Sequence, residues 1–379
     1  MITSIDIGSF TTNVVVLKRA DKTLKIAARV AVPTKGVEHG YIMVPQETEA
    51  TLARALGLIE QKLGEKVTNV IVAASGAGLE SNSHQVSTIV TLGSGEVTDL
   101  DISKSIDKAS VQATRKNRKI IESLATSYIL DGKPVVGSPV GMKGKKLETT
   151  VFFIDYPTTT IETIEDICDR LDLDLLDIIP SPLACSCVSL SDIERKVGSI
   201  LVDIGSDTTE ILVYEHDTPL LLKSIAFGSH DITNAIALGL KVTVEEAEQI
   251  KLGVQPKQAH HIDKVDKIIS KKLSELFKSI NQELASISKK QLLPAGIILS
   301  GGGALTPGIE ELAKEKLCIP AHKAAPRSVS KSDGVDHDIP WSIAYGLAVL
   351  GLERKQAGMY GTFGNIGESM KSFMRKFFI

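Results

Sequence analysis

Two short turns hold the residues whose types and spacing are best suited to chemistry. Segments 6–12 and 203–209 are identical at six of their seven positions, and each opens with an aspartate, an isoleucine and a glycine. Glycine-bearing turns present backbone N–H groups that can hold phosphate oxygens, and carboxylates bind Mg²⁺, mostly through water. We therefore predict that the two turns hold one polyphosphate and that Asp6 and Asp203 hold Mg²⁺. Two structural aspartates that simply open turns are the alternative.

Because the two turns are so similar and each follows a β-rich segment, an internal duplication explains them better than chance. Such a duplication would make the turns face each other across a cleft. The residues expected to contact the phosphates are Gly8, Ser9, Phe10 and Thr11 in the first turn and Gly205, Ser206, Asp207 and Thr208 in the second.

A third glycine cluster comprises Gly301, Gly302 and Gly303. Consecutive glycines carry no side chain that would keep the backbone away from a flat ring. The cluster is therefore predicted to form another wall of the site, and a tight strand-to-helix turn is the alternative. Glu248 and Lys251 lie three residues apart on a predicted helix, where they could meet a ribose or form an ordinary surface ion pair.

Short strands are expected to position these turns. Residues 2–7 and 13–17 predict a hairpin with an aspartate at its mouth, and residues 200–213 predict a near copy of it. A buried-type strand over 295–299 leads into the third glycine cluster, and 244–252 is expected to be the helix that carries the acidic and basic pair. Both halves of the chain are thus predicted to be α/β.

The composition is that of an ordinary globular chain. The 379 residues are 43% hydrophobic and 23% charged, and a net charge of -3 argues against a general nucleic-acid binder. No apolar run is long enough to span a bilayer, and no signal-like segment follows Met1, so we expect a cytoplasmic protein. The cysteines have no metal-ligand spacing and are expected to fill apolar space; they are Cys168, Cys185, Cys187 and Cys318.

The C-terminal segment, residues 365–379, has the pattern of a basic amphipathic helix. The glycine-containing stretch before it, 356–364, is expected to be a linker that separates it from the body. A helix with this pattern favours the interface of an anionic membrane, and a last helix packed on the core is the alternative. The residues expected to contact lipid are Ile366, Met370, Lys371, Phe373, Met374, Arg375, Lys376, Phe377 and Phe378.

The ordered set of motifs resembles the superfamily of actin, sugar kinases and heat-shock chaperone ATPases, and within it the FtsA family of bacterial cell division. The first turn resembles the family's first phosphate motif, the second turn its second phosphate motif, and Ser300–Gly303 its adenosine motif. Segments 182–184 and 344–348 are similar to the two helices that connect the halves. The resemblance implies a duplicated actin-like (ribonuclease H-like) core that binds ATP and Mg²⁺ in the cleft between its halves.

An insertion over residues 79–156 makes the resemblance to FtsA specific. It is expected to contain strands over 86–92, 128–129 and 150–154 and a helix over 102–114, and it is similar to the relocated subdomain of FtsA. Pilus-assembly proteins of the PilM type share this subdomain. They lack the terminal amphipathic helix, which is present in FtsA.

Several positions depart from the family pattern. The second turn has Ser206 and Asp207 where the family usually has glycine, and the first has Phe10 and Thr11 where many relatives have serine and lysine. Ser181 stands near the place where chaperone-like relatives carry a glutamate that positions the attacking water. The resemblance therefore implies slow or conditional ATP hydrolysis at most, with the nucleotide mainly setting domain closure.

The resemblance implies four subdomains and a tail. Core subdomain 1A is expected to comprise 1–78, 157–189 and 341–355, and core subdomain 2A 190–240 and 292–340. Relocated subdomain 1C would be 79–156 and helical subdomain 2B 241–291, followed by the linker and the membrane-targeting helix.

The FtsA family further implies a role and its partners. A protein of this kind is expected to form filaments at the cytoplasmic face of the cell membrane, at the division site, where it anchors the tail of FtsZ through subdomain 2B and recruits later division proteins. Binding of nucleic acid is not expected. A PilM-like adaptor of type IV pilus assembly is the first alternative, and a small-molecule kinase is a more distant one.

Overall fold

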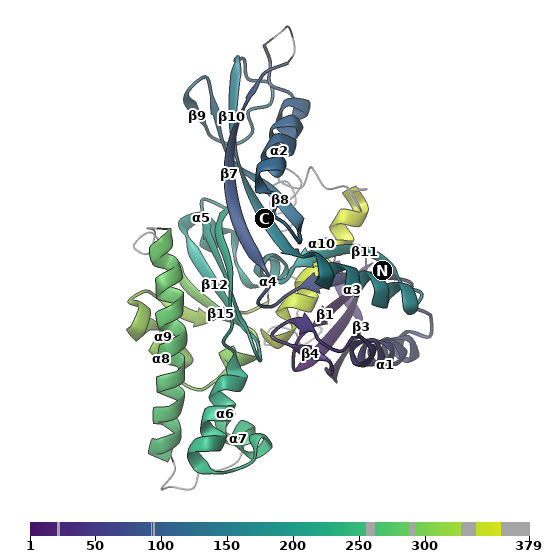
Figure 1. Ribbon diagram of the computed structural model, residues 1–379, viewed down its shortest axis with the longest axis vertical. Helices are drawn as coiled ribbons and strands as arrows, with labels where there is room; N and C mark the ends of the chain where they lie inside the picture. The colour runs from purple at the N-terminus through teal and green to yellow at the C-terminus, as the bar shows by residue number, and fades with distance from the viewer. Residues whose placement is uncertain are drawn as a thin grey trace.

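The computed structural model of this chain describes residues 1–20, 23–91, 93, 95–254, 262–287, 293–326 and 339–357. They form a five-stranded sheet, a nine-stranded sheet and a small two-stranded one, with helices against the faces of the larger two. Figure 1 shows the long axis of the molecule, with the inserted subdomain at one end and the helices α6 and α7 at the other.

The first sheet forms the core of the N-terminal half. Its strands, in spatial order, are β11 (Asp174–Pro180), β6 (Asn69–Ala74), β1 (Ile2–Ile7), β2 (Thr11–Ala20) and β3 (Thr23–Pro33). Strand β1 pairs antiparallel with β2 and parallel with β6. Helices α1 (Pro45–Leu63) and α3 (Thr158–Arg170) contribute to the apolar cluster on one face, and α10 (Ser342–Ala357) packs on the other.

Strand β2 shows why this sheet carries an almost continuous apolar run. Val14 and Val16 belong to the cluster that includes the buried face of α1, whereas Val15 and Leu17 belong to the cluster that includes α10. Successive strand residues point to opposite faces, so a strand covered on both sides needs apolar residues at every position.

The second sheet repeats the arrangement of the first. Its strands in this half are β12 (Ser199–Ile204), β13 (Thr209–Glu215), β14 (Thr218–Ile225), β15 (Gly296–Ser300) and β16 (Ala321–Lys323). Strand β12 pairs antiparallel with β13 and parallel with β15, as β1 does with β2 and β6. Helix α9 (Ile309–Leu317) contributes to the apolar cluster on one face. The repeated topology confirms the predicted duplication.

The inserted subdomain continues the second sheet. Its elements are β7 (Glu80–Ile89), α2 (Asp99–Ala113), β8 (Arg118–Leu130), β9 (Lys133–Val135) and β10 (Lys146–Pro157). Strand β7 joins β14 through a single pair, Lys223 with Glu80. The predicted strand bounds 86–92, 128–129 and 150–154 were wrong. The strands begin earlier, in segments with polar or partly buried residues that an apolar pattern does not mark.

Helices α6 (Ser229–Leu240) and α7 (Val244–Lys251) lie at the opposite end of the molecule, and the long helix α8 (Ile262–Ser286) runs from there along the second sheet (Figure 1). Together with α9 they bury one apolar cluster against the second sheet. Helix α8 contributes a stripe at steps of three and four residues, which is the spacing that a buried helix face requires. The residues of the stripe are Val265, Ile269, Leu273, Leu276, Phe277, Ile280 and Leu284.

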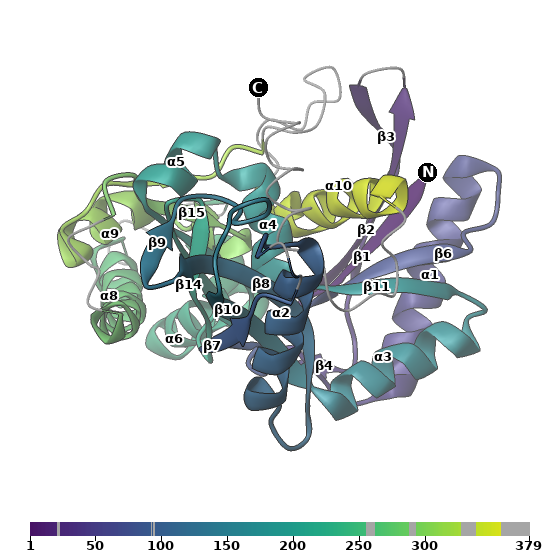
Figure 2. The ribbon, with the colours of Figure 1, turned by 90° about the horizontal axis from the view of Figure 1, so that it is seen from above.

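Helices α4 (Ser181–Ser189) and α10 lie side by side between the halves, as Figure 2 shows. A Cβ atom on Gly346 would lie 1.8 Å from the Ala184 carbonyl oxygen, so only glycine permits this approach. The short elements are β4 (Val37–Glu38), β5 (Tyr41–Ile42), α5 (Asp192–Val197), η3 (Gly302–Leu305) and η5 (Ile339–Trp341). Among the residues that the structure describes, no helix is both long enough and apolar enough to cross a membrane.

The predicted linker and membrane helix, 356–364 and 365–379, lie outside the described residues except where α10 extends to Ala357.

Candidate functional site

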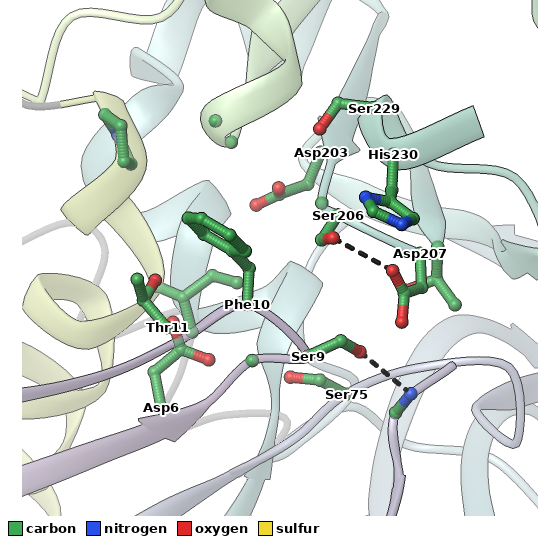
Figure 3. A pocket seen from close by; sticks show the side chains of 18 of the residues that line it. Asp6, Ser9, Phe10, Thr11, Ser75, Asp203, Ser206, Asp207, Ser229 and His230 are labelled. Carbon is green, nitrogen blue, oxygen red and sulfur yellow. Dashed lines mark hydrogen bonds between the residues drawn. The ribbon is translucent and has the colours of Figure 1, made fainter. Parts of the chain in front are cut away.

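Both aspartate turns open on one cavity of about 290 Å³ between the two halves. Figure 3 shows the first turn and the second turn on opposite sides of it, with the Phe10 ring pointing inward. Of the predicted ligand residues, those that line the cavity are Asp6, Gly8, Ser9, Phe10, Thr11, Asp203, Gly205, Ser206, Asp207, Thr208, Glu248, Gly301 and Gly302. Lys251 and Gly303 do not line it.

The two turns have the same internal hydrogen bond. The N–H of Gly8 donates to the Thr11 carbonyl oxygen at 3.1 Å, and the N–H of Gly205 donates to the Thr208 carbonyl oxygen at 2.8 Å. The residues that replace glycine in the second turn, 206 and 207, do not have a positive φ. Their side chains therefore impose no strain on the turn, and the loss of glycine there does not by itself disturb the site.

Asp6 and Asp203 are buried at equivalent positions at the ends of β1 and β12. Asp6 accepts a hydrogen bond from Asn13 Nδ2 at 3.3 Å, whereas Asp203 Oδ2 is buried without a hydrogen-bond partner. Burial raises the pKa of Asp6 to about 7 and the pKa of Asp203 to about 6. An unpaired buried carboxylate oxygen beside a cavity is what a cation or a donating ligand would satisfy.

Glu210 is a third buried carboxyl that the sequence interpretation missed. It stands across from Asp203 in the β12–β13 ladder, as Asn13 stands across from Asp6 in the β1–β2 ladder. The amide donor of the first repeat is thus replaced by an acid in the second, which is why Asp203 lacks the partner that Asp6 has. Extending the comparison of the two turns by one residue would have revealed this difference.

The Glu210 carboxyl forms two hydrogen bonds of 2.6 Å, one from the N–H of Gly76 to Oε1 and one between Oε2 and Ser181 Oγ. Ser181 Oγ also donates to the Ala74 carbonyl oxygen at 2.8 Å. A hydroxyl has one hydrogen, so when it is given to Ala74 the Ser181–Glu210 bond requires a protonated Glu210. Burial, reinforced by the negative charges of Asp203 and Asp6, raises the pKa of Glu210 to about 8, in agreement with this assignment.

The third glycine cluster packs against the second turn. A Cβ atom on Gly301 would lie 2.3 Å from Asp203 Oδ1, and one on Gly303 would lie 2.2 Å from Ile204 Cγ2. Gly302 has no neighbouring atom within 4 Å of such a Cβ position and borders the cavity. Gly301 and Gly303 therefore permit close packing. Gly301 and Gly302 present backbone to a ligand in the cavity, and Gly303 does not.

Glu248 and Lys251 form an ion pair of 2.8 Å on α7, but Lys251 is buried rather than on the surface. Its ammonium group also donates to Thr233 Oγ1 at 2.9 Å and to the Ser229 carbonyl oxygen at 3.2 Å. Burial lowers the pKa of Lys251. The lysine thus joins α7 to α6, and its charge holds the Glu248 carboxylate at the edge of the cavity.

Acidic residues line the cavity without a lysine or arginine among the described residues there. Five of the lining residues carry carboxyl groups. A polyphosphate entering such a site needs a cation to offset the repulsion. Across the described part of the chain, no group of three or more His, Cys, Asp or Glu side chains is placed to hold a metal ion.

A duplicated α/β core with a cleft between its halves is the actin-like fold, and solved structures confirm it. The type IV pilus PilM–PilN complex aligns with a TM-score of 0.70 at 17% identity, over 93% of this chain and 98% of that one. MreB5 of Spiroplasma citri bound to ADP aligns with a TM-score of 0.53 at 13% identity, over 94% and 96%. These likenesses concern the fold.

Sequence comparisons identify the family. Residues 200–344 match the family model described as Cell division protein FtsA, and residues 78–154 match the SHS2 domain inserted in FtsA. The FtsA of Pseudomonas aeruginosa is 28% identical over 95% of this chain and 91% of its own length, and that of Bacillus subtilis is 26% identical over 87% and 80%. Both models and both relatives are those of FtsA, so the chain resembles the FtsA family of cell-division proteins over most of its length.

Proposed function

We propose that the cleft binds ATP with Mg²⁺. The observation that carries the proposal is the unpartnered, buried Asp203 Oδ2 beside a cavity closed by two equivalent glycine-bearing turns. Asp6 and Asp203 would hold the ion, the two turns the phosphates, and Gly301 and Gly302 the adenosine. The ion would supply the positive charge that the acidic cavity needs before it accepts a polyphosphate.

Calorimetry with the full chain tests this assignment. Mg²⁺ and ATP together should bind the wild-type protein, whereas ATP with a chelator should not, because the acidic residues would repel it. Asp203→Asn keeps the shape of the side chain and should weaken Mg²⁺-dependent binding by at least about ten-fold, which corresponds to about 1.4 kcal/mol. Asp131→Asn, in an exposed turn of the inserted subdomain, is the matched control. Equal affinities for the two variants would contradict the assignment.

We further propose that hydrolysis is slow or conditional. Ser181 supplies a hydroxyl bonded to Glu210 and not a free carboxylate at the start of α4. No lysine or arginine among the described lining residues is placed to stabilise charge that develops on a transferred phosphoryl group. We expect turnover below the range of about 1–100 s⁻¹ typical of kinases, as a phosphate-release assay would measure. Bound nucleotide would then act mainly by setting the closure of the two halves.

In the cell, we propose that the protein forms filaments on the cytoplasmic face of the membrane at the division site. The segment 365–379 would bind anionic lipid, and the region 241–291 would receive the C-terminal tail of FtsZ. Support for the second contact is a set of exposed lysines on α8, which an acidic peptide would complement; they are Lys264, Lys267, Lys271 and Lys278, with Lys272 half-buried. Later division proteins would be recruited to the same filaments.

A PilM-like adaptor function is the alternative proposal. It is supported by a fold likeness at 17% identity, whereas the matching family models are those of FtsA. Binding of FtsZ tail peptide to the full chain, measured by fluorescence anisotropy, separates the two functions. A charge-reversing pair, Lys267→Glu with Lys271→Glu, should weaken that binding if α8 forms the docking surface.

A further inference from the structure

The segment that follows β6 borders the cavity on one side and the inserted subdomain on the other. On the cavity side, Gly76 N–H donates to Glu210. Ser75 also lines the cavity, and its Oγ atom is buried without a hydrogen-bond partner. An unsatisfied hydroxyl at this place is available to a ligand. Residues 75–76 are therefore positioned to respond when the cavity is filled.

A second backbone segment, His39 and Gly40, lies against the first. A Cβ atom on Gly40 would be 2.3 Å from the Cα of Gly76, so the two segments touch at their glycines. Gly40 N–H donates to Ser9 Oγ and His39 N–H donates to Asp207 Oδ2, both at 3.3 Å. This segment thus contacts both phosphate turns, one from each half of the protein.

The side chain of Tyr156 contacts both segments. It lies at the end of β10, the last strand of the inserted subdomain, and its side chain is buried. Its hydroxyl group lies 2.5 Å from the Ser75 carbonyl oxygen and 3.4 Å from the Gly40 carbonyl oxygen. Arg118, at the start of β8, anchors the next turn by donating to the Gly78 carbonyl oxygen at 2.6 Å.

We propose that Tyr156 is a positioning residue through which the nucleotide cleft and the inserted subdomain sense each other. This inference rests on the proposed binding of nucleotide in the cleft. A ligand that engages Ser9, Asp207 or Ser75 shifts the segments 39–40 and 75–76, and the tyrosine hydroxyl, which lies within hydrogen-bond distance of a carbonyl oxygen in each, passes that shift to β10. By linkage, any contact that fixes the inserted subdomain changes the affinity of the cleft by the same factor.

The physical basis is the sharing of one hydroxyl by two carbonyl oxygens. The single hydrogen of the tyrosine can be given to only one of them at a time, and the distances favour Ser75 in the present arrangement. Because the residue is buried, no water replaces a lost bond without cost. A small relative movement of the two segments therefore changes the energy of the strand end that carries Tyr156.

Hydrogen-exchange mass spectrometry of the full chain tests the proposal, with Mg²⁺ and AMPPNP as the probe. In the wild-type protein the nucleotide should slow exchange both at the second turn, residues 203–209, and in β10, residues 146–157. Tyr156→Phe keeps the ring and removes the hydroxyl. The variant should retain the slowing at the second turn, whereas the slowing in β10 should be smaller by about five-fold or more, the lower range of typical couplings.

Tyr128→Phe is the matched control, because Tyr128 is a buried tyrosine of the same subdomain that packs in its separate apolar cluster. It should behave like the wild-type protein. Undiminished slowing of β10 in Tyr156→Phe, or an equal loss in Tyr128→Phe, would overturn the proposal. A wild-type protein without any slowing at 203–209 would instead overturn the nucleotide assignment itself, and the coupling with it.

Discussion

At the scale of single residues, the two repeats of the core differ in one substitution with electrostatic consequences. Asn13 in the first repeat can donate to Asp6, whereas Glu210 at the same place in the second repeat brings a further acid close to Asp203. Like charges buried together disfavour joint ionisation. The buried carboxyl groups of the cleft therefore keep their protons to a higher pH than exposed carboxyl groups do.

We predict that this acidic cluster makes the metal-free protein less stable as the pH rises. Burial raises the pKa of Glu210 from 4.5 to about 8, so between these values the folded state binds more protons than the unfolded state. The contribution of Glu210 to the free energy of unfolding is therefore present at low pH, and it is lost as the pH rises through the folded-state pKa. From pH 6 to pH 8.5 the loss should be on the order of 1–3 kcal/mol.

Thermal unfolding of the wild-type protein and of Glu210→Gln at the two pH values measures this contribution. The glutamine does not titrate, so the difference in Tm between pH 6 and pH 8.5 should be smaller by several degrees in the variant. Glu165→Gln is the control because its carboxylate is half exposed in an ion pair with Lys119. Identical pH dependences for wild type and Glu210→Gln would show that Glu210 is not protonated in the fold.

At the scale of elements, the sequence predicted the strands and helices that have a local apolar periodicity or that occur in both repeats. The hairpins of the two turns and the helix at 244–252 follow from apolar runs and glycine-bearing turns. The structure places their bounds within a residue or two, except that β2 continues to Ala20 where 17 was the predicted end. Strand β7 was underestimated because its first half, Glu80–Gln85, is polar and only partly buried. The role of residues 75–76 could not be predicted, because it depends on contacts with Glu210 and Tyr156 that lie far away in the sequence.

Helix α2 suggests how the inserted subdomain contributes to the proposed filaments. Leu100 and Val111 are 60% and 78% exposed, and eleven residues apart they fall on the same side of a helix with 3.6 residues per turn. Ile89 and Val136 of the same subdomain are also largely exposed. Interaction sites expose apolar surface, and within the inserted subdomain we therefore expect the filament contact to include some of these side chains.

Charge substitutions at these positions should therefore disrupt assembly while ATP binding is retained. We predict that at least one of Ile89→Glu, Val136→Glu and the pair Leu100→Glu with Val111→Glu abolishes filaments on lipid, as seen by electron microscopy. Ile193→Glu on α5 is the control, since Ile193 is 71% exposed but lies outside the subdomain. Filaments formed by all three variants would mean that the contact lies on another surface.

At the scale of the whole molecule, the two ends of the described chain meet different parts of the body. Strand β1 lies at the centre of the first sheet, whereas α10 ends beside the inserted subdomain, where Arg354 pairs with Glu122 of β8 and Asp177 of β11. Arg354 and Glu122 are both buried, and breaking such a pair on one side is costly. These ion pairs therefore join the C-terminal part of α10 to both the core and the inserted subdomain.

The segment 365–379 should bring this body to a membrane. As an in-plane helix it would bury Phe373, Met374 and Phe377, each contributing at most on the order of 1.5–3 kcal/mol. Basic residues near anionic lipid add about 1 kcal/mol each, and ordering of the helix opposes binding. One tail should therefore bind weakly and reversibly, and many tails on one filament would bind firmly by avidity.

Sedimentation with phosphatidylserine-containing vesicles tests the membrane proposal. Phe377→Glu removes an apolar anchor and brings a carboxylate to a negative surface, so it should release the protein from the vesicles. Ser372→Glu adds the same charge on the opposite side of the helix, about 140° from Phe377 at 100° per residue, and should weaken binding much less. Raised salt should reduce wild-type binding only in part, because screening leaves the apolar contribution intact. If a chain lacking residues 365–379 still sediments with the vesicles, the tail is not the anchor.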